Sequence, residues 1–306
     1  MLLIERALKC VVFIGMVSDP HGRTFTPHGT GFLFSVFHDD IRFDYIVTCH
    51  HVIESIIGDT IWVRLNIKDG GARSIRVAKS SWVYNPKQDI AALSQEIGEL
   101  DDVTRIVEKD VITKKVLGEQ REILPGELTF LVGLFTSHYG ITHNLPITRL
   151  GNIAALPEEL IFTETGYVKC YLVETRSISG LSGSPVFLNR ASWRNKLEDD
   201  QIECLFLGMM RGRFNTTDAN DVVAGDSIAD TINTGIGIVI PSEMIMEIIN
   251  KPEFVAQRED TVKKLKKKTH YRPSKATRKV DNPQHKEDFN SLLAAAAKKK
   301  KLDDET

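Results

Sequence analysis

Short apolar runs alternate with polar, glycine-containing segments along most of the chain, from residue 10 to about residue 252. The runs are rich in Val, Ile, Phe and Tyr, which favour β-strands. Clear examples lie at residues 10–14, 31–37, 45–48, 60–65, 128–133 and 204–208. Short strands separated by turns at this spacing predict an all-β fold of the sandwich or barrel type, rather than a parallel sheet with crossover helices.

A different pattern begins at Pro241 and Ser242, where we expect one amphipathic helix. Ser242 is a suitable N-cap, and apolar side chains follow at helical spacing up to Ile249. The Asn-Lys-Pro sequence at 250–252 predicts the end of this helix, which would close the globular body.

Charge is unevenly distributed, although the net charge of the whole chain is only −2. Residues 257–306 hold 15 Lys and Arg against 8 Asp and Glu, whereas the remainder holds 24 against 33. This last segment has too few apolar residues to offset the entropy lost on ordering, so we expect a basic disordered tail. Its lysine clusters at 263–268 and 298–301 could dock an acidic protein partner. No aromatic residues interleave with these lysines as base-stacking platforms would, which argues against nucleic acid.

The sequence also indicates the compartment. No apolar run approaches the roughly 20 residues that span a bilayer, so no membrane segment is expected. The first 16 residues are apolar but contain Glu5, Arg6 and Lys9, which fits a secretory signal poorly and makes export the less favoured alternative. A cytoplasmic protein is therefore expected.

Cysteine usage agrees with this placement. Four cysteines without close pairing, each in an apolar stretch, are typical of reduced thiols rather than of a disulfide framework, although the even number would permit two disulfides. They are Cys10, Cys49, Cys170 and Cys204.

Three segments hold side chains with candidate catalytic chemistry: YIVTCHHVI at 45–53, NPKQDIAAL at 85–93 and SGLSGSPVF at 179–187. Each alone has an ordinary structural explanation, because histidines at strand ends, aspartates in turns and Gly-Ser-Pro turns are common. Together they offer a hydroxyl, an imidazole that can remove its proton, and a carboxylate that can orient the imidazole. The glycines allow the amides of Gly180 and Ser182 to face a developing oxyanion.

These segments, in this order, resemble the trypsin-like serine peptidases of the chymotrypsin fold. VTCHHV at 47–52 is similar to the family's V-T-x-x-H segment, which assigns the base to His51 rather than His50. DIAAL at 89–93 resembles D-I-A-L-L, and GLSGSP at 180–185 resembles G-x-S-G-G-P. GTGF at 29–32 and GIGIVIPS at 235–242 resemble two more segments, the second as found in the bacterial, disulfide-free Deg branch.

The resemblance implies two consecutive six-stranded antiparallel β-barrels. The first would span residues 1–115 and carry the His and Asp, and the second would span 116–256 and carry the Ser and the closing helix. The basic tail would then follow at 257–306.

The resemblance also implies a function. Ser182 would be the nucleophile, His51 its base and Asp89 the orienting acid, with Gly180 and Ser182 forming the oxyanion hole. The expected activity is that of a serine endopeptidase acting on protein or peptide substrates through an acyl-enzyme, with no cofactor and no metal.

Departures from the family pattern refine this picture. Ser184 replaces a glycine, which should leave the turn intact. Leu181 replaces the aspartate that pairs with a new N-terminus in secreted trypsins, so activation by N-terminal trimming is not expected.

The preference for the residue before the cleaved bond is the least constrained expectation. Arg176, six residues before the nucleophile, would lie at the base of the specificity pocket, near Arg213, Gly235 and also Arg211. A guanidinium there would favour an acidic side chain or a C-terminal carboxylate. Alternatively, Arg176 pairs with Glu174 and leaves a small apolar pocket.

Two other functions remain open at this point. A catalytically silent trypsin-fold module could use its basic tail to bind a protein or a nucleic acid, although silent relatives usually lack one of the three catalytic residues. A metal site is the weaker alternative, because the candidate histidines match no ligand spacing and no paired cysteines support them. They are His21, His28, His38, His50 and His51.

Overall fold

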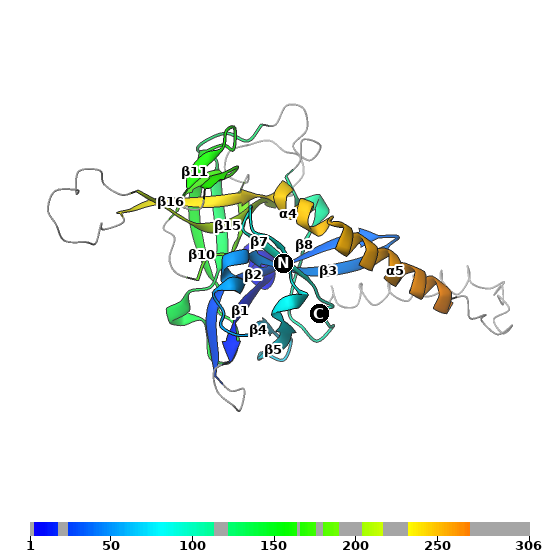
Figure 1. Ribbon diagram of the computed structural model, residues 1–306. Helices are drawn as coiled ribbons and strands as arrows, with labels where there is room; N and C mark the ends of the chain where they lie inside the picture. The colour runs from blue at the N-terminus through cyan, green and yellow to red at the C-terminus, as the bar shows by residue number, and fades with distance from the viewer. Residues whose placement is uncertain are drawn as a thin grey trace, which may run out of the picture. The chain divides into compact units, whose positions relative to one another are not determined.

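The computed structural model describes residues 3–17, 24–112, 122–163, 166–175, 180–189, 204–216 and 232–269. The chain divides into two compact units, Met1–Val262 and Lys263–Thr306, and the second is described only as far as Thr269. All of the fold that follows, except the end of the last helix, belongs to the first unit (Figure 1).

The N-terminal half is one antiparallel sheet of strands drawn in blue to cyan in Figure 1. Its hydrogen-bonded order is β5-β4-β1-β2-β3-β7-β6, and β8 pairs in parallel with β2 at Phe34 and Ser35. The strands are β1 (Val11–Val17), β2 (Phe25–His38), β3 (Ile41–Cys49), β4 (Thr60–Asn66), β5 (Ala72–Ala78), β6 (Val83–Asn85), β7 (Ile90–Ser94) and β8 (Ile106–Val107).

The C-terminal half is a closed barrel in the order β10-β13-β16-β15-β14-β9, and β11 and β12 form a separate hairpin. All neighbouring strands of the barrel are antiparallel. The strands are β9 (Leu128–Gly133), β10 (Ile147–Ala155), β11 (Ile161–Thr163), β12 (Gly166–Val168), β13 (Tyr171–Glu174), β14 (Pro185–Asn189), β15 (Cys204–Thr216) and β16 (Ile232–Pro241).

The all-β class and the six-stranded antiparallel barrel agree with the sequence-based prediction. The N-terminal half, expected to be a six-stranded barrel, is instead an eight-stranded sheet, because β6 and β8 add to it, and its end strands β5 and β6 do not pair with each other. The predicted boundary between the halves, at residues 115 and 116, lies outside the described part of the chain.

Helices are few and lie mainly at the ends of the described chain. The predicted closing helix is α4 (Ser242–Ile249), and it ends where expected. Ser242, the expected N-cap, is instead the first residue of the helix, because strand β16 runs up to Pro241, which holds the N-cap position without a side-chain cap. A second helix, α5, starts directly at Pro252, since proline is well tolerated in the first turn of a helix. The predicted start of the disordered tail at residue 257 therefore falls inside α5, and residues 270–306 lie outside the described part. The helices and 3₁₀ turns are α1 (Leu3–Lys9), α2 (His50–Glu54), η1 (Lys79–Ser81), η2 (Glu108–Asp110), η3 (Thr136–His138), α4 (Ser242–Ile249) and α5 (Pro252–Thr269).

Aromatic side chains from both halves meet in the larger of two hydrophobic clusters, and the smaller cluster lies mainly within the barrel. Phe206 of β15 contacts Phe32 and Phe34 of β2, with ring centroids 5.3 and 6.2 Å apart. Phe187 of β14 also packs on Phe206, at 6.0 Å. These rings are almost fully buried, so the N-terminal sheet and the barrel are packed directly against each other. Side chains from the two halves can therefore share one site with little freedom to move apart.

Three of the four cysteines, Cys10, Cys49 and Cys170, are free and buried. In the part of the chain that the structure describes, no helix is long and apolar enough to cross a membrane.

Candidate active site

His51 lies in the first turn of α2, immediately after strand β3. Its backbone amide donates to Asp89 Oδ1 at 2.9 Å, and its ring nitrogen Nδ1 lies 2.7 Å from Asp89 Oδ2. An ionised carboxylate only accepts hydrogen bonds, so Nδ1 carries the ring proton and Nε2 is left with a lone pair. The side chain of His51 is 48% exposed, so this lone pair is available to a substrate or a nucleophile.

Asp89 is held in a left-handed backbone conformation, with φ of +56°. Aspartate is one of the few residues besides glycine that visit this region readily. The Asp89 amide donates to Pro86 O at 3.2 Å, and Asp89 O accepts from the His50 amide at 3.1 Å. The turn before β7 (Ile90–Ser94) is thus tied to the end of β3, which directs the carboxylate at His51.

The carboxylate of Asp89 has a third donor that the sequence did not reveal. Arg211 of β15 donates from Nε to Asp89 Oδ2 at 3.2 Å, and both side chains are about nine-tenths buried. Burial alone would raise the pKa of Asp89. The hydrogen bonds from His51 and the charges of His51 and Arg211 outweigh it, so the pKa lies below its usual value. Asp89 is therefore ionised at neutral pH.

Cys49 lies directly beside this pair. Its Sγ, a His51 ring nitrogen and an Asp89 oxygen all lie within 4.8 Å of one another, as ligands of a metal ion would. However, burial and the charge of Asp89 raise the pKa of the Cys49 thiol well above its usual value, and Sγ donates to Met210 O at 3.4 Å. The positive charge of Arg211 also opposes a cation here. This trio is consequently a poor metal site.

The turn that carries Ser182 is anchored to strand β2 by Thr30. The Thr30 amide donates to Ser182 O at 2.9 Å, and Thr30 Oγ1 donates to Gly180 O at 2.7 Å. The amide of Gly183 donates to Met210 O at 2.8 Å, the same carbonyl that accepts from Cys49. The serine turn is therefore bonded to both halves of the fold.

Close packing at Gly29 locates this turn relative to His51. A Cβ at Gly29 would lie 2.6 Å from Cγ1 of Val52 and 3.3 Å from Ser182 O. The main chain of Ser182 thus lies beside the side chain of Val52, the residue that follows His51. All three residues expected to form the triad are brought to one region, where the N-terminal sheet meets the barrel.

The serine turn also contains the two expected oxyanion donors. Among the described residues, neither the amide of Gly180 nor that of Ser182 donates to another protein group. Gly180 has φ of +96° and Gly183 has φ of +86°, so both occupy the region that favours glycine. Within the same part of the chain, Ser182 Oγ makes no hydrogen bond to the His51 ring.

His50, the neighbouring histidine, has different surroundings. Its ring meets that of Tyr84 edge to face, with centroids 5.0 Å apart, and Nδ1 lies 3.9 Å from Glu54 Oε2. Only its backbone amide contacts Asp89, through Asp89 O.

The residues expected in the specificity pocket are only partly described. Arg176 lies outside the described residues. Arg213 is exposed, and Gly235 has φ of +77° and accepts from the Thr175 amide at 2.7 Å. Arg211 is engaged with Asp89, and it lies at a register shift of β15, between Met210, which pairs with Val239, and Gly212, which pairs with Ile238. No local sequence pattern signals such a contact, which joins residues 122 positions apart.

The sequence matches no known protein-family profile and no curated protein. Solved structures do match the fold. The protease domain of MamO from Magnetospirillum magneticum, in its apo form, aligns with 80% of this chain and 98% of its own, at a TM-score of 0.50 and 14% identity. The Rv3671c protease aligns with 80% of this chain in two inactive forms, one of them a serine-to-alanine mutant from M. tuberculosis. These cover 89% and 88% of their own chains at TM-scores of 0.44 and 0.43 and identities of 16% and 15%. This chain therefore has the trypsin-like serine protease fold.

Proposed function

We propose that this protein is a serine endopeptidase that hydrolyses peptide bonds with Ser182 as nucleophile, His51 as base and Asp89 as orienting acid. The observation that carries the proposal is the double contact between His51 and Asp89, at 2.9 Å from the amide and 2.7 Å from the ring. It fixes both the direction and the tautomer of the imidazole, which a base acting on a serine hydroxyl requires.

The remaining parts of the mechanism follow from this arrangement. Nε2 of His51 takes the proton as Ser182 Oγ attacks the substrate carbonyl, and the amides of Gly180 and Ser182 stabilise the oxyanion. The new Oγ–C bond is retained while the C–N bond breaks, and His51 returns the proton to the leaving amine. A water molecule, deprotonated by His51, then releases the acid and restores Ser182.

The absence of a hydrogen bond between Ser182 Oγ and the His51 ring, within the described part of the chain, is compatible with this proposal. Hydrogen bonds between a nucleophile and its base are often long or poorly aligned in free enzymes and tighten with substrate. Rotation about the Cα–Cβ bond of Ser182 is the smallest change that could bring the hydroxyl toward Nε2.

Labelling with a fluorophosphonate probe tests the nucleophile directly, because only an activated serine reacts. We expect one labelled site, Ser182, and no labelling in Ser182→Ala or His51→Ala protein. His50→Ala is the matched control and should retain most of the labelling rate, since its ring packs on Tyr84. Labelling of Ser182→Ala protein, or equal losses for the two histidine variants, would contradict the assignment.

A second candidate function is a catalytically silent module that binds a partner. The contact between Arg211 and Asp89 favours it, because a buried positive charge beside the carboxylate opposes formation of the imidazolium. A folded protein that never reacts with the probe, even with Arg211 replaced by Ser, would favour this function over the peptidase.

A preference for an acidic residue just before the cleaved bond is also a proposal. In the sequence-based assignment, an acidic preference depends on Arg176 and Arg213. A peptide library would test it, and a preference for Val, Ala or Leu that persists in Arg176→Ala protein would contradict it.

A further inference from the structure

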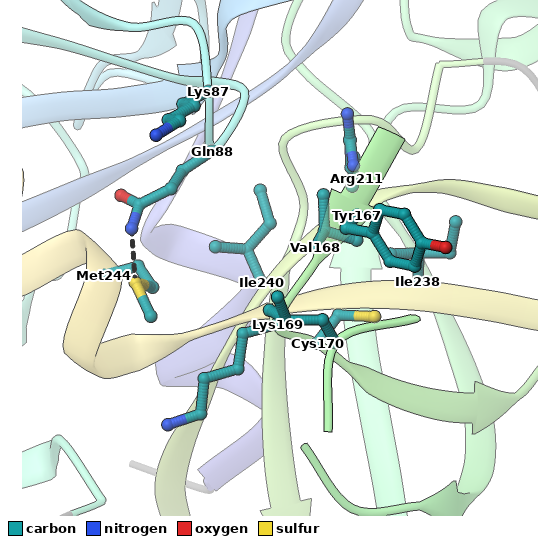
Figure 2. Close-up of a pocket in the computed structure, with 11 residues that line it drawn as sticks. Lys87, Gln88, Tyr167, Val168, Lys169, Cys170, Arg211, Ile238, Ile240 and Met244 are labelled. Carbon is teal, nitrogen blue, oxygen red and sulfur yellow. Dashed lines mark hydrogen bonds between the residues drawn. The ribbon is translucent and has the colours of Figure 1, made fainter. Parts of the chain in front are cut away.

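A cavity of about 370 Å³ lies next to the turn that precedes Asp89 (Figure 2). Lys87 and Gln88 line one side, and Arg211 lies on the opposite side in Figure 2, with Ile240 between them. Its volume is at the lower end of the range of about 300–1,000 Å³ for small-molecule sites. The cavity takes no part in the mechanism proposed above.

The cavity has a buried floor and an exposed rim. The floor is apolar apart from one guanidinium: Ile238, Ile240 and Cys170 are no more than 6% exposed, and Arg211 is 9% exposed. The rim continues as apolar surface onto the β11–β12 hairpin, where Leu160 and Tyr167 are 61% and 70% exposed. Phe162 is also exposed and packs edge to face on Tyr167, at 5.2 Å.

The charge of the lining has one sign. Lys87 and Lys169 are exposed at the rim and Arg211 lies in the floor, and no Asp or Glu is among the described residues that line the cavity. Asp89 offsets one of these charges from behind Arg211, and Glu247 contacts Gln88 at 3.3 Å from outside the lining. The charged side chains of the described lining itself are all positive, which favours an anion over a cation in the cavity.

We propose that this cavity binds a small carboxylate with an apolar chain, and that the bound carboxylate acts on Asp89 through Arg211. A planar guanidinium matches a carboxylate in shape and charge. The aliphatic floor disfavours a phosphate dianion, which would cost more to desolvate beside a single buried cation. The apolar chain would lie along the floor and the Leu160 and Tyr167 rim.

A single oxygen of Asp89 links the cavity to the candidate active site. Arg211 donates to Asp89 Oδ2, the same oxygen that accepts the His51 ring nitrogen. A ligand carboxylate bound to the Arg211 guanidinium weakens the electrostatic attraction between Arg211 and Asp89. The carboxylate of Asp89 then stabilises an imidazolium at His51 more strongly, which makes His51 a better base. The ligand would therefore activate the enzyme, and this half of the proposal rests on the proposed function.

Calorimetry with octanoate tests the binding half, with octylamine and octan-1-ol as ligands of matched length and different charge. We expect saturable binding of octanoate to Ser182→Ala protein, with both controls about tenfold weaker or more, as the loss of one ionic contact predicts. Lys169→Glu should weaken octanoate binding by a similar factor, whereas Lys109→Glu, an exposed lysine outside the lining, should not. Absence of saturable octanoate binding, or equal affinity for octanol, would overturn the proposed site.

The rate of fluorophosphonate labelling of wild-type protein tests the coupling half. We expect octanoate to raise the rate severalfold, with half of the effect at its dissociation constant, and Lys169→Glu to shift that concentration upward. An unchanged rate in protein whose cavity is saturated would remove the link through Arg211. Protein that binds octanoate but is never labelled would count against the peptidase and leave the binding site intact.

Discussion

At the scale of single residues, Asp89 combines an uncommon backbone conformation with a carboxylate that accepts hydrogen bonds from three donors. Its two oxygens accept from the amide and ring of His51 and from Nε of Arg211. Asp89 has a left-handed φ of +56° in the turn directly before strand β7. Such conformations cost free energy and persist where surrounding contacts enforce them, often at functional sites.

We predict that Asp89→Asn lowers stability in a pH-dependent way. Asparagine tolerates the same backbone conformation, so the change mainly removes the charge. The folded pKa of Asp89 lies below its unfolded value, so the charge stabilises the protein above the ordinary pKa of about 3.9 and this contribution is lost as pH falls through the folded pKa. Urea unfolding should give a gap between wild type and variant of roughly 1–3 kcal/mol at neutral pH. A gap that does not shrink in acid would contradict this explanation.

At the scale of elements, the turn at residues 180–185 depends on how closely it approaches β2 and β3. A Cβ at Gly183 would lie 1.9 Å from Thr30 O and 2.5 Å from Thr48 Oγ1, and both partners are held in place by strand pairing. Ser184, which departs from the family pattern, is fully buried, and its Oγ has no hydrogen-bond partner among the described residues. Its amide and carbonyl are bonded to Leu181 O and the Met210 amide.

We therefore predict opposite effects for alanine at these two neighbouring positions. A buried hydroxyl without a hydrogen-bond partner costs about 1–3 kcal/mol of stability. Ser184→Ala removes this hydroxyl, so the free energy of unfolding should stay equal or rise. Gly183→Ala forces both a left-handed backbone and a clash with Thr30 O, and should destabilise the protein by more than about 3 kcal/mol. Thermal unfolding of both variants measures the contrast. A clear loss of stability in Ser184→Ala would show that its hydroxyl is satisfied.

The elements themselves could be predicted wherever local sequence decides them. The apolar run at 128–133 is β9, and the helix expected after Ser242 is α4, which starts one residue earlier than the expected N-cap implied and ends at Ile249 as predicted. The continuation into α5 could not be predicted, since Pro252 also reads as a helix stop. Its few buried side chains are spaced four apart, at Phe254, Arg258 and Val262, among many exposed charges. This i, i+4, i+8 spacing is the only sequence signal for a buried face of α5, and the charged Arg258 within it makes the face look polar in the sequence.

At the scale of the whole first unit, the candidate site exists because two sheets are packed against each other. The proximity of His51, Asp89 and Ser182 could be predicted from the sequence, because each residue lies within a short recognisable segment. Contacts set by the packing itself could not be foreseen: Thr30 holds the serine turn, and Arg211 reaches Asp89 from the barrel. These depend on strand register and on the meeting of the two halves, which no short window of sequence contains.

The first half of α5 is part of the same packing, and Arg258 is its main polar contact. The buried guanidinium donates to Tyr45 Oη at 2.8 Å, to Ile249 O at 2.9 Å and to Asn250 Oδ1 at 3.0 Å. Phe254 packs edge to face on Tyr45, with centroids 4.9 Å apart. Tyr45 lies in β3, whose last residue precedes α2 and the candidate base, so α5 braces the strand that leads to the site.

We predict that Arg258→Ala lowers the melting temperature and that Gln257→Ala, at an exposed neighbouring position in the same helix, does not. Loss of the guanidinium leaves the buried Tyr45 hydroxyl and the Ile249 carbonyl without this donor, at a cost of about 2–4 kcal/mol. For a domain of this size that corresponds to a fall of roughly 5–15 °C. Arg258→Lys keeps the charge but cannot reach all three acceptors, so it should fall between the two. Calorimetry of the three variants measures the contrast, and equal melting temperatures for Arg258→Ala and Gln257→Ala would mean that the Arg258 hydrogen bonds contribute nothing to stability.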